Sequence, residues 1–286
     1  MPGPYYLCTE NTFHAAFLVT QWLADHGKQE GFRGVVLRED ALPATLLADR
    51  DRFHSVHAGA CELDDDAWSE LIRLYPGLSA TERAMIAEFG VPARTVTSHP
   101  DTVYLGRRLN SDTARDWLTR ACAEPELPYL FVFLDKILAP WWIELTGSRI
   151  VNAHSAVLPH ARGTFAIEQV AALRDRELFS ACAGATAHFV DDGVDTGPII
   201  KALRFTDPFS FGSIWSCKGN SFMLAFDVLG QVAQELLDGR RATHAGVLPA
   251  PSAHGAPEFR RRDLTPRRQA EAEAGYLAMR NAASER

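Results

Sequence analysis

Three short apolar runs, each followed at once by polar residues, constrain the fold of this 286-residue chain most strongly. The runs are Tyr129 to Leu134, Arg149 to Val151 and Ala185 to Val190. Continuous apolar runs without alternation are typical of central parallel strands that are buried on both faces. In such sheets, ligands bind beyond the carboxyl ends of the strands. We therefore expect the polar residues that follow the three runs to meet in one crevice.

The N-terminal residues predict the same kind of sheet. Tyr5 to Cys8 is a short apolar run, apolar residues at helical spacing follow as far as Gly27, and Phe32 to Leu37 has the character of a second strand. A chain that opens strand, helix, strand begins a doubly wound sheet. The predicted fold class is therefore α/β, with a doubly wound, mostly parallel, Rossmann-like sheet.

Two segments depart from this alternation of strands and helices. Residues 38–80 contain the acidic cluster Asp64 to Asp66 and a helical-looking stretch, AWSELIRLY, and we interpret them as an insertion. After residue 242 the chain is rich in Pro and Gly and then ends in a charged helical stretch. We expect a main domain over residues 1–242, with the insertion at about 38–80, and a C-terminal extension over residues 243–286.

Charge and cysteine usage exclude several classes of protein. The formal net charge of −7 argues against a broad phosphate-binding surface, so we expect no nucleic-acid partner. No apolar stretch approaches the roughly 20 residues that a membrane span requires, and the N-terminus lacks the pattern of a secretory signal. The five cysteines are scattered and form no Cys-x-x-Cys pair, which is typical of a reducing compartment. These features predict a cytoplasmic protein without a membrane partner.

The polar residues after the second and third runs suggest a reaction at a carbonyl carbon. An Asn offers a neutral N–H donor to a developing oxyanion, and Asn152 is such a residue. His154, next to an ionised Asp from the segment Asp191 to Asp195, would have a raised pKa and could move protons near neutral pH. Ser155 lacks the context of a nucleophile elbow. The set therefore fits attack by a substrate nucleophile rather than by the protein.

Metal binding is the main alternative for these side chains. Candidate ligands are His154, His160, His188, Asp191, Asp192 and Asp195. None of them has the His-x-x-x-His or EF-hand spacing that a metal site would show, so we expect no metal.

Two linked motifs resemble the formyltransferase family. The run NAHSAVLPHARG, from Asn152 to Gly163, is similar to the family's Asn-x-His-x-Ser-x-Leu-Pro-x-x-x-Gly motif, except that the family's Ser falls on Ala156. The run GATAHFVDDGVDTGPII is similar to the family's Gly-x-Thr-x-His-x-x-x-x-x-x-Asp-x-Gly segment. The resemblance covers residues from about 85 to 235. The members that the chain resembles are the catalytic domains of the glycinamide ribonucleotide, methionyl-tRNA and sugar N-formyltransferases.

The resemblance implies the formyltransferase type of Rossmann-like fold, with residues 1–242 as the catalytic domain. It implies 10-formyltetrahydrofolate as formyl donor and cosubstrate, and no metal. Its catalytic trio falls on Asn152, His154 and Asp195: Asn152 and His154 stabilise the oxyanion, and Asp195 orients His154 and favours its charged form. The pterin pocket implied by the family would be formed by Leu134, Lys136, Ile137, Leu138, Val190, Asp191 and Asp192.

The departures from the family's members narrow the expected acceptor. The glycine-rich phosphate loop of the glycinamide ribonucleotide enzymes is replaced here by CTENTFHAAF, and no basic C-terminal barrel suited to tRNA follows. We therefore expect a small-molecule amine or hydroxylamine acceptor, such as an amino sugar, an amino acid or an N-hydroxylated ornithine, in specialised metabolism. A formyltetrahydrofolate deformylase and a folate-binding protein without catalysis are the alternatives. The sequence also leaves open a homodimer that forms through the C-terminal tail.

Overall fold

The computed structural model describes residues 3–241, 245–248 and 257–284, which divide into two compact units. The first unit comprises Met1–Ile150 with Leu237–Arg240, and the second comprises Val151–Leu236 with Arg241–Arg286. Parts of the predicted C-terminal extension, residues 243–244, 249–256 and 285–286, lie outside the described residues. The predicted division into residues 1–242 and 243–286 stays a prediction.

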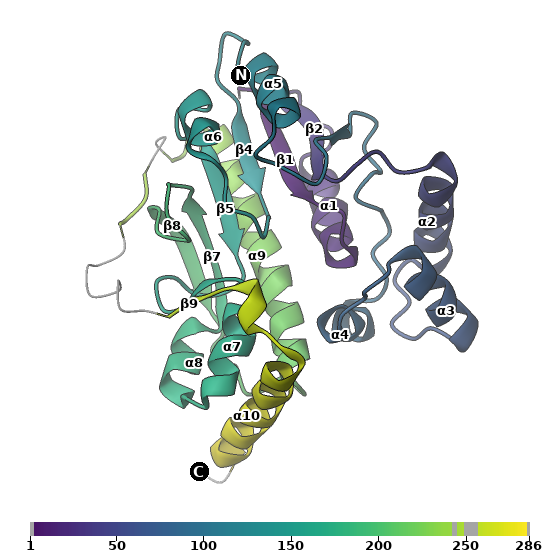
Figure 1. Cartoon of the computed structure of the whole chain (residues 1–286), viewed down its shortest axis with the longest axis vertical. Coiled ribbons are helices and arrows are strands. Elements are labelled where there is room, and N and C mark those ends of the chain that lie inside the picture. Colours follow the sequence, from purple (N-terminus) through teal and green to yellow (C-terminus); the bar gives the residue numbers. More distant parts are fainter. Residues whose placement is uncertain (1–2, 242–244, 249–256, 285–286) are drawn as a thin grey trace. The chain divides into compact units, whose positions relative to one another are not determined.

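The first unit is a parallel sheet with flanking helices (Figure 1). Its elements are β1 (Tyr5–Glu10), α1 (Phe13–Asp25), β2 (Phe32–Arg38), α2 (Ala44–His57), α3 (Asp65–Leu74), α4 (Ala80–Phe89), β3 (Val103–Tyr104), α5 (Asp112–Ala121), β4 (Tyr129–Val132) and α6 (Pro140–Leu145). The strands lie in the order β3-β2-β1-β4 and every pair is parallel. These strands follow the order 3-2-1-4 with which a Rossmann sheet begins, so the predicted fold class is confirmed.

Burial explains why the first strands and helix form as the sequence predicts. The side chains of Tyr5, Trp22 and Phe131 are almost fully buried and contact one another, joining α1 to β1 and β4. Both faces of a central strand are covered in this arrangement, which is why the apolar runs show no alternation.

The segment at residues 38–80 contains two helices. The predicted helical stretch is α3, which begins at the Asp64 cap, where the carboxylate accepts a hydrogen bond from the Ala67 amide. Helix α2 was not predicted, because its apolar and charged residues do not fall on separate faces. The following helix, α4, begins with a reciprocal capping box between Ser79 and Glu82.

His54 on α2 is a buried, doubly hydrogen-bonded imidazole. Its Nδ1 donates to the Pro92 carbonyl at 2.7 Å, and its Nε2 accepts from the Tyr75 hydroxyl at 2.8 Å. Burial is the largest influence, and it lowers the pKa of His54 to about 4.

We expect the His54 imidazole to stay neutral from pH 7 down to about pH 5 and to titrate near pH 4. The unfolded chain takes up this proton first, at about pH 6.5, so the group's contribution to stability is lost as the pH falls from there towards 4. That loss is at most about 3 kcal/mol. An NMR titration of the His54 ring checks the pKa, and titration at the ordinary value for histidine would contradict the burial argument.

The second unit contains antiparallel strands with helices packed on them. Its elements are β5 (Ile150–His154, whose first residue belongs to the first unit), β6 (Arg162–Gly163), α7 (Ala166–Leu173), α8 (Arg176–Cys182), β7 (Gly184–Phe189), β8 (Ile199–Arg204), α9 (Ile214–Leu237, whose last residue belongs to the first unit), β9 (Glu258–Phe259), the 3-10 helix η2 (Arg261–Asp263) and α10 (Pro266–Ser284). Strand β7 pairs with both β5 and β8 in antiparallel fashion.

The expectation that the run Ala185 to Val190 forms a parallel strand was therefore wrong. All six residues of β7 are buried, as a continuous apolar run predicts, but burial on both faces does not encode the direction of a strand. The chain passes through α7 and α8 before β7 and enters that strand from the opposite end. Phe189, at the end of β7, consequently pairs with Val151, and Thr186 pairs with His154.

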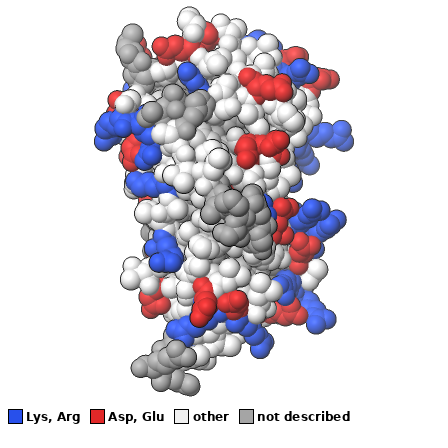
Figure 2. Space-filling model, turned by 90° about the vertical axis from the view of Figure 1, so that its left-hand side faces the viewer, with Lys and Arg blue, Asp and Glu red and all other residues white. Residues whose placement is uncertain are grey.

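The C-terminal segment is part of the core of the second unit. Helix α10 lies beside α7 (Figure 1), and its residues Ala272, Tyr276 and Met279 are buried in the same cluster as Ile167 and Phe179. Within the described residues, every helix is too short or too polar to cross a lipid bilayer. On the face shown in Figure 2, acidic and basic side chains are interspersed rather than gathered by sign.

Candidate functional site

The end of β5 and its partner strand β7 carry the polar residues at the centre of the candidate site. Asn152 and His154 both lie on β5, and His188 lies directly opposite Asn152 in the antiparallel pair. Directly opposite residues on paired strands place their side chains within contact distance. The Asn152 Nδ2 atom is 3.1 Å from His188 Nε2.

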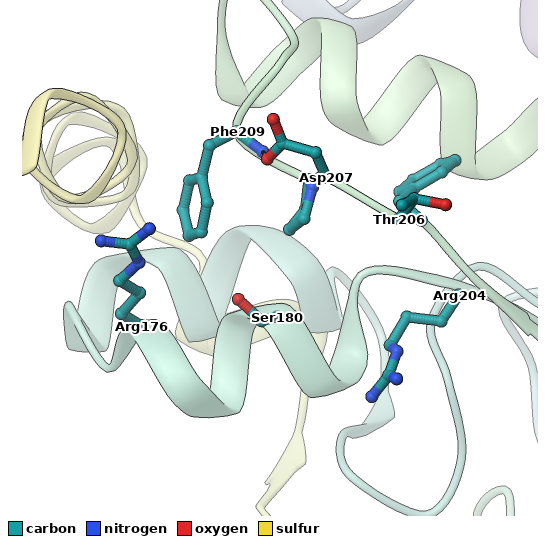
Figure 3. Close-up of a pocket in the computed structure, with 8 residues that line it drawn as sticks. Arg176, Ser180, Arg204, Thr206, Asp207 and Phe209 are labelled. Carbon is teal, nitrogen blue, oxygen red and sulfur yellow. Dashed lines mark hydrogen bonds between the residues drawn. The ribbon is translucent and has the colours of Figure 1, made fainter. Parts of the chain in front are cut away.

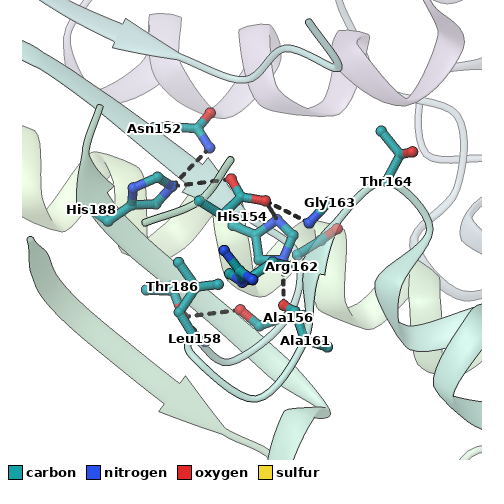
Figure 4. Close-up of polar contacts among 12 residues, drawn as sticks. Asn152, His154, Ala156, Leu158, Ala161, Arg162, Gly163, Thr164, Thr186 and His188 are labelled. Atoms are coloured by element: carbon teal, nitrogen blue, oxygen red, sulfur yellow. Dashed lines mark hydrogen bonds and ion pairs between the residues drawn. The ribbon is translucent and has the colours of Figure 1, made fainter. Parts of the chain in front are cut away.

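Asp195 joins these side chains into one cluster. Figure 4 shows Asn152, His154 and His188 at the centre of this cluster, with the contacts drawn as dashed lines. Its Oδ2 atom is 3.5 Å from His154 Nδ1, and its Oδ1 atom is 3.4 Å from His188 Nε2. The Gly163 amide donates a 2.7 Å hydrogen bond to Oδ2. The structure thus brings together Asn152, His154 and Asp195, the three residues of the predicted catalytic trio.

The backbone of Asp195 adopts a left-handed conformation, with φ of 51°. Asp and Asn tolerate this region better than most residues, and non-glycine residues there are uncommon. Asp195 lies in the loop between β7 and β8. The turn of the backbone there directs its carboxylate towards His154, although β7 runs antiparallel to β5.

His188 was considered from sequence only as a metal ligand, and the structure makes it a member of the catalytic cluster. Its Nδ1 donates to the Phe189 carbonyl at 2.9 Å, which leaves Nε2 to accept from the Asn152 amide. The ring therefore holds the Asn152 carboxamide in one orientation. A histidine inside an otherwise apolar strand was the available signal, since a buried polar side chain needs a partner.

The electrostatics of His154 correct one expectation. Burial is the largest influence and lowers the pKa of His154, and the neighbouring charge of Asp195 does not compensate for it. His188 and Lys218 lower it further, while the Ala161 carbonyl acts in the opposite direction. The prediction of a raised pKa was wrong because it considered only the carboxylate and not the loss of water around the ring.

The hydrogen bonds of His154 define its neutral form. Nε2 lies 3.1 Å from the Ala161 carbonyl oxygen, which can only accept, so Nε2 carries the proton. Nδ1 then has a free lone pair on the side of Asp195. A proton taken up at Nδ1 would produce an imidazolium beside a carboxylate.

Asp195 remains ionised in this setting. Burial alone would raise its pKa, but the two imidazoles and the Gly163 amide together hold the pKa of Asp195 well below its usual range. A permanently charged Asp195 beside a neutral His154 is suited to stabilise a transient positive charge on the ring.

Ser155 is hydrogen-bonded within a second buried polar cluster. Lys218 on α9 donates to the Ser155 hydroxyl at 2.7 Å, and the same ammonium lies 3.5 Å from a carboxylate oxygen of Glu168. Lys218 and Glu168 are both almost fully buried. The Ser155 carbonyl also accepts from the Ser221 hydroxyl at 2.8 Å. These contacts fix the end of β5 and occupy the Ser155 hydroxyl with a hydrogen bond from Lys218, which is itself paired with Glu168.

The residues of the predicted pterin pocket fall in two groups. Residues 134–138 follow β4 in the first unit, where Leu138 is buried, Lys136 is exposed and the Ile137 side chain is 60% exposed. Val190 and Asp191 are half-buried and Asp192 is exposed in the second unit. An exposed apolar side chain such as Ile137 suits contact with a flat aromatic ring, whereas Asp191 is already engaged by the Thr196 hydroxyl at 2.7 Å.

A separate hollow lies elsewhere in the second unit, between α8 and the segment after β8 (Figure 3). Its volume is about 640 Å³, and Arg176, Arg204, Asp207 and Phe209 are among its lining residues. It contains none of the predicted site residues. In the part of the chain that the structure describes, no group of three or more His, Cys, Asp or Glu side chains is arranged to hold a metal ion.

Comparisons with known proteins agree with the resemblance seen in the motifs. The family model described as formyl transferase matches residues 75–205. A phosphoribosylglycinamide formyltransferase from Mycobacterium tuberculosis is 35% identical over 120 residues, which are 40% of this chain and 48% of that protein. A formyltetrahydrofolate deformylase from Mycobacterium bovis is 29% identical over 131 residues, covering 46% of this chain and 37% of that protein. The chain thus spans less than half the length of these curated relatives.

Solved structures show the same fold along most of the chain. A sugar N-formyltransferase from a Shewanella species superposes with a TM-score of 0.55 at 11% identity, covering 96% of this chain and 88% of its own. An N-formyltransferase from Helicobacter canadensis, in complex with folinic acid and dTDP-3-aminofucose, gives a TM-score of 0.52 at 14% identity, covering 92% of this chain and 72% of its own. At these identities the likeness concerns the fold.

Proposed function

We propose that the protein is an N-formyltransferase, because residues 75–205 match the family model described as formyl transferase. It moves a formyl group from 10-formyltetrahydrofolate to the amine or hydroxylamine of a small molecule. The observation that carries this proposal is the cluster of Asn152, His154, His188 and Asp195, which contains an oriented N–H donor, a neutral imidazole and a fixed carboxylate. No residue of the cluster is placed to act as a nucleophile, so the attacking atom belongs to the acceptor.

Each side chain has a distinct part in the proposed reaction. As the acceptor nitrogen bonds to the formyl carbon, the carbonyl electrons move to oxygen, and the Asn152 amide donates a hydrogen bond to that oxyanion. The acceptor nitrogen loses its proton to Nδ1 of His154, and Asp195 stabilises the resulting imidazolium. His154 then returns the proton to the departing nitrogen of the folate, which leaves as tetrahydrofolate.

The ion pairs of Arg38 in the first unit support an acceptor that the protein does not bind through a phosphate group. At the carboxyl ends of β1 and β2, the Arg38 guanidinium is 2.7 Å from Glu10 and 3.3 Å from Asp135. Burial and the neighbouring Asp135 raise the pKa of Glu10 to about 7. The cation at this edge is thus already paired with carboxylates, and the loop after β1 lacks the glycines of a phosphate loop. An amino sugar, an amino acid or a hydroxylamine such as an N-hydroxylated ornithine remains the proposed acceptor class, in specialised metabolism.

The cysteines support a cytoplasmic location. In the part of the chain that the structure describes, Cys8, Cys61, Cys122, Cys182 and Cys217 form no disulfide. Cysteines outside disulfides are typical of a reducing compartment, where folate-dependent transfer to a small metabolite would take place.

The deformylase remains the second candidate, because the chain is also similar to formyltetrahydrofolate deformylases. In that reaction water would take the place of the amine, with the same four side chains. A folate-binding protein without catalysis is less consistent with the complete cluster.

We expect 10-formyltetrahydrofolate to be converted to tetrahydrofolate only when a suitable amine is present. Loss of the donor is followed by absorbance, and a pooled library of amino sugars, amino acids and hydroxylamines supplies the acceptor. A new formylated product identified by mass spectrometry would support the transferase. Steady turnover without any amine would instead establish a deformylase, and donor binding without turnover would favour the non-catalytic alternative.

A further inference from the structure

We infer that the C-terminal strand β9 is a positioning element of the active site, acting through the segment Ala161 to Thr164. This inference rests on the proposed function, because it assigns a role to residues that act on His154 and Asp195. It also assigns a role to the segment after residue 256, which lies outside both catalytic motifs.

One edge of the segment is bonded to β9. The Arg162 amide donates to the Pro257 carbonyl at 3.0 Å, and the Thr164 amide donates to the Phe259 carbonyl, also at 3.0 Å. Gly163 lies against the Phe259 backbone with φ of 87°, and a Cβ atom there would collide with the Phe259 carbonyl oxygen. Only glycine allows this close approach of two backbones.

The opposite edge of the same segment holds the catalytic pair. The Ala161 carbonyl accepts from His154 Nε2, and the Gly163 amide donates to Asp195 Oδ2. In an extended chain, successive amides point to opposite sides. The amides of Arg162 and Thr164 therefore face β9 while that of Gly163, between them, faces Asp195.

Two further anchors tie β9 to the body of the second unit. The Gln169 amide of α7 donates to the Thr164 carbonyl at 3.3 Å and to the Arg260 carbonyl at 3.2 Å, so it bridges the segment and the residue after β9. The Tyr276 hydroxyl of α10 is buried and bonds the Pro208 carbonyl at 2.9 Å. The C-terminal segment is thus held before η2 by Gln169 and after it, within α10, by Tyr276.

The consequence for catalysis lies in the imidazole of His154. The Ala161 carbonyl determines that Nε2 carries the proton, and so leaves Nδ1 as the nitrogen that receives the acceptor's proton. If Ala161 were displaced, its carbonyl would no longer hold the proton of His154 on Nε2. If Gly163 were displaced, Asp195 would lose the hydrogen bond from the Gly163 amide. Strand β9 therefore acts on the reaction without touching either catalytic side chain.

Phe259→Pro, compared with Phe259→Ala, tests this inference. Proline fixes φ at about −65° and removes the amide N–H, which is incompatible with a regular parallel strand, whereas alanine leaves both the N–H and the backbone conformation of β9 in place. We expect kcat to fall about 10²-fold in Phe259→Pro, as misplacement of catalytic groups by about an ångström does, with little change in KM for the donor. Phe259→Ala should lose far less, although its side chain packs on the core of the unit.

Two measurements detect positioning without any assay of transfer. Amide exchange at Gly163 should accelerate in Phe259→Pro. NMR titration should show the pKa of His154 moving up towards its ordinary value as water reaches the ring, which Asp195, His188 and Lys218 surround. A general loss of stability would not by itself produce this selective change.

Faster exchange at Gly163 with unchanged kcat and unchanged titration of His154 would overturn the inference. If Phe259→Pro does not fold, Gln169→Ala provides the milder variant, because it removes the bridge between Thr164 and Arg260 and leaves β9 intact. An intermediate loss of kcat with a shifted His154 titration is then expected, and wild-type values for both would contradict it. Absence of transfer by the wild-type protein would refute the proposed function, whereas the exchange and titration experiments would still decide whether β9 positions the pair.

Discussion

Asp195→Asn is expected to lower kcat by about 10²- to 10⁴-fold while the protein remains folded. The substitution keeps the shape of the side chain, an acceptor for the Gly163 amide and a residue type that tolerates the left-handed backbone. It removes the negative charge that stabilises a protonated His154. Steady-state kinetics with the identified acceptor, together with the thermal unfolding midpoint, measure the two effects separately.

Asp195→Ala provides the comparison that separates charge from hydrogen bonding. It removes the bond to Gly163 as well as the charge, so its kcat should be equal to or lower than that of Asp195→Asn, and its unfolding midpoint should be lower. Near wild-type turnover in Asp195→Asn would remove the carboxylate charge from the mechanism and leave Asp195 with a structural part only.

Asn152→Ala is expected to lower kcat by about 10²- to 10³-fold, the loss usual for removal of one oxyanion donor. KM for the donor should change little, because the oxyanion exists only along the reaction path and not in the bound donor. Single-turnover measurements of formyl transfer check this effect on the chemical step.

His188→Ala is the matched variant for this second prediction. It leaves the Asn152 amide in place and removes the ring that orients it, so we expect a smaller loss than in Asn152→Ala. In the double variant the two losses should not add, since His188 acts partly through Asn152. Fully additive losses would show that His188 acts independently of Asn152.

The three residues of the proposed catalytic trio could be singled out from sequence because each belongs to a spaced motif. Asn152 and His154 are two residues apart on one strand, so their side chains point to the same face wherever that strand lies. Asp195 could be assigned only through the resemblance of its segment to the family, since nothing in the spacing from 154 to 195 says that the loop after β7 turns back towards β5.

The pattern of apolar residues could not predict the role of His188 or the direction of β7. A continuous run of buried residues has the same appearance in a parallel and in an antiparallel strand, and direction depends on the connection through α7 and α8. The partner of His188 is a residue 36 positions away, so its role becomes visible only when the two strands are paired.

By itself, the sequence determined the α/β class, the residues of the proposed catalytic trio and the family that their motifs resemble, because these depend on local periodicity and on fixed spacing. Only the tertiary structure decided the sign of the shift in the pKa of His154, the orientation of Asn152 by His188, and the attachment of β9 to the segment that holds both His154 and Asp195. The physical reason is that desolvation and hydrogen bonding act between atoms that are close in space, and Gly163 and Phe259 are 96 residues apart in the chain (259 minus 163).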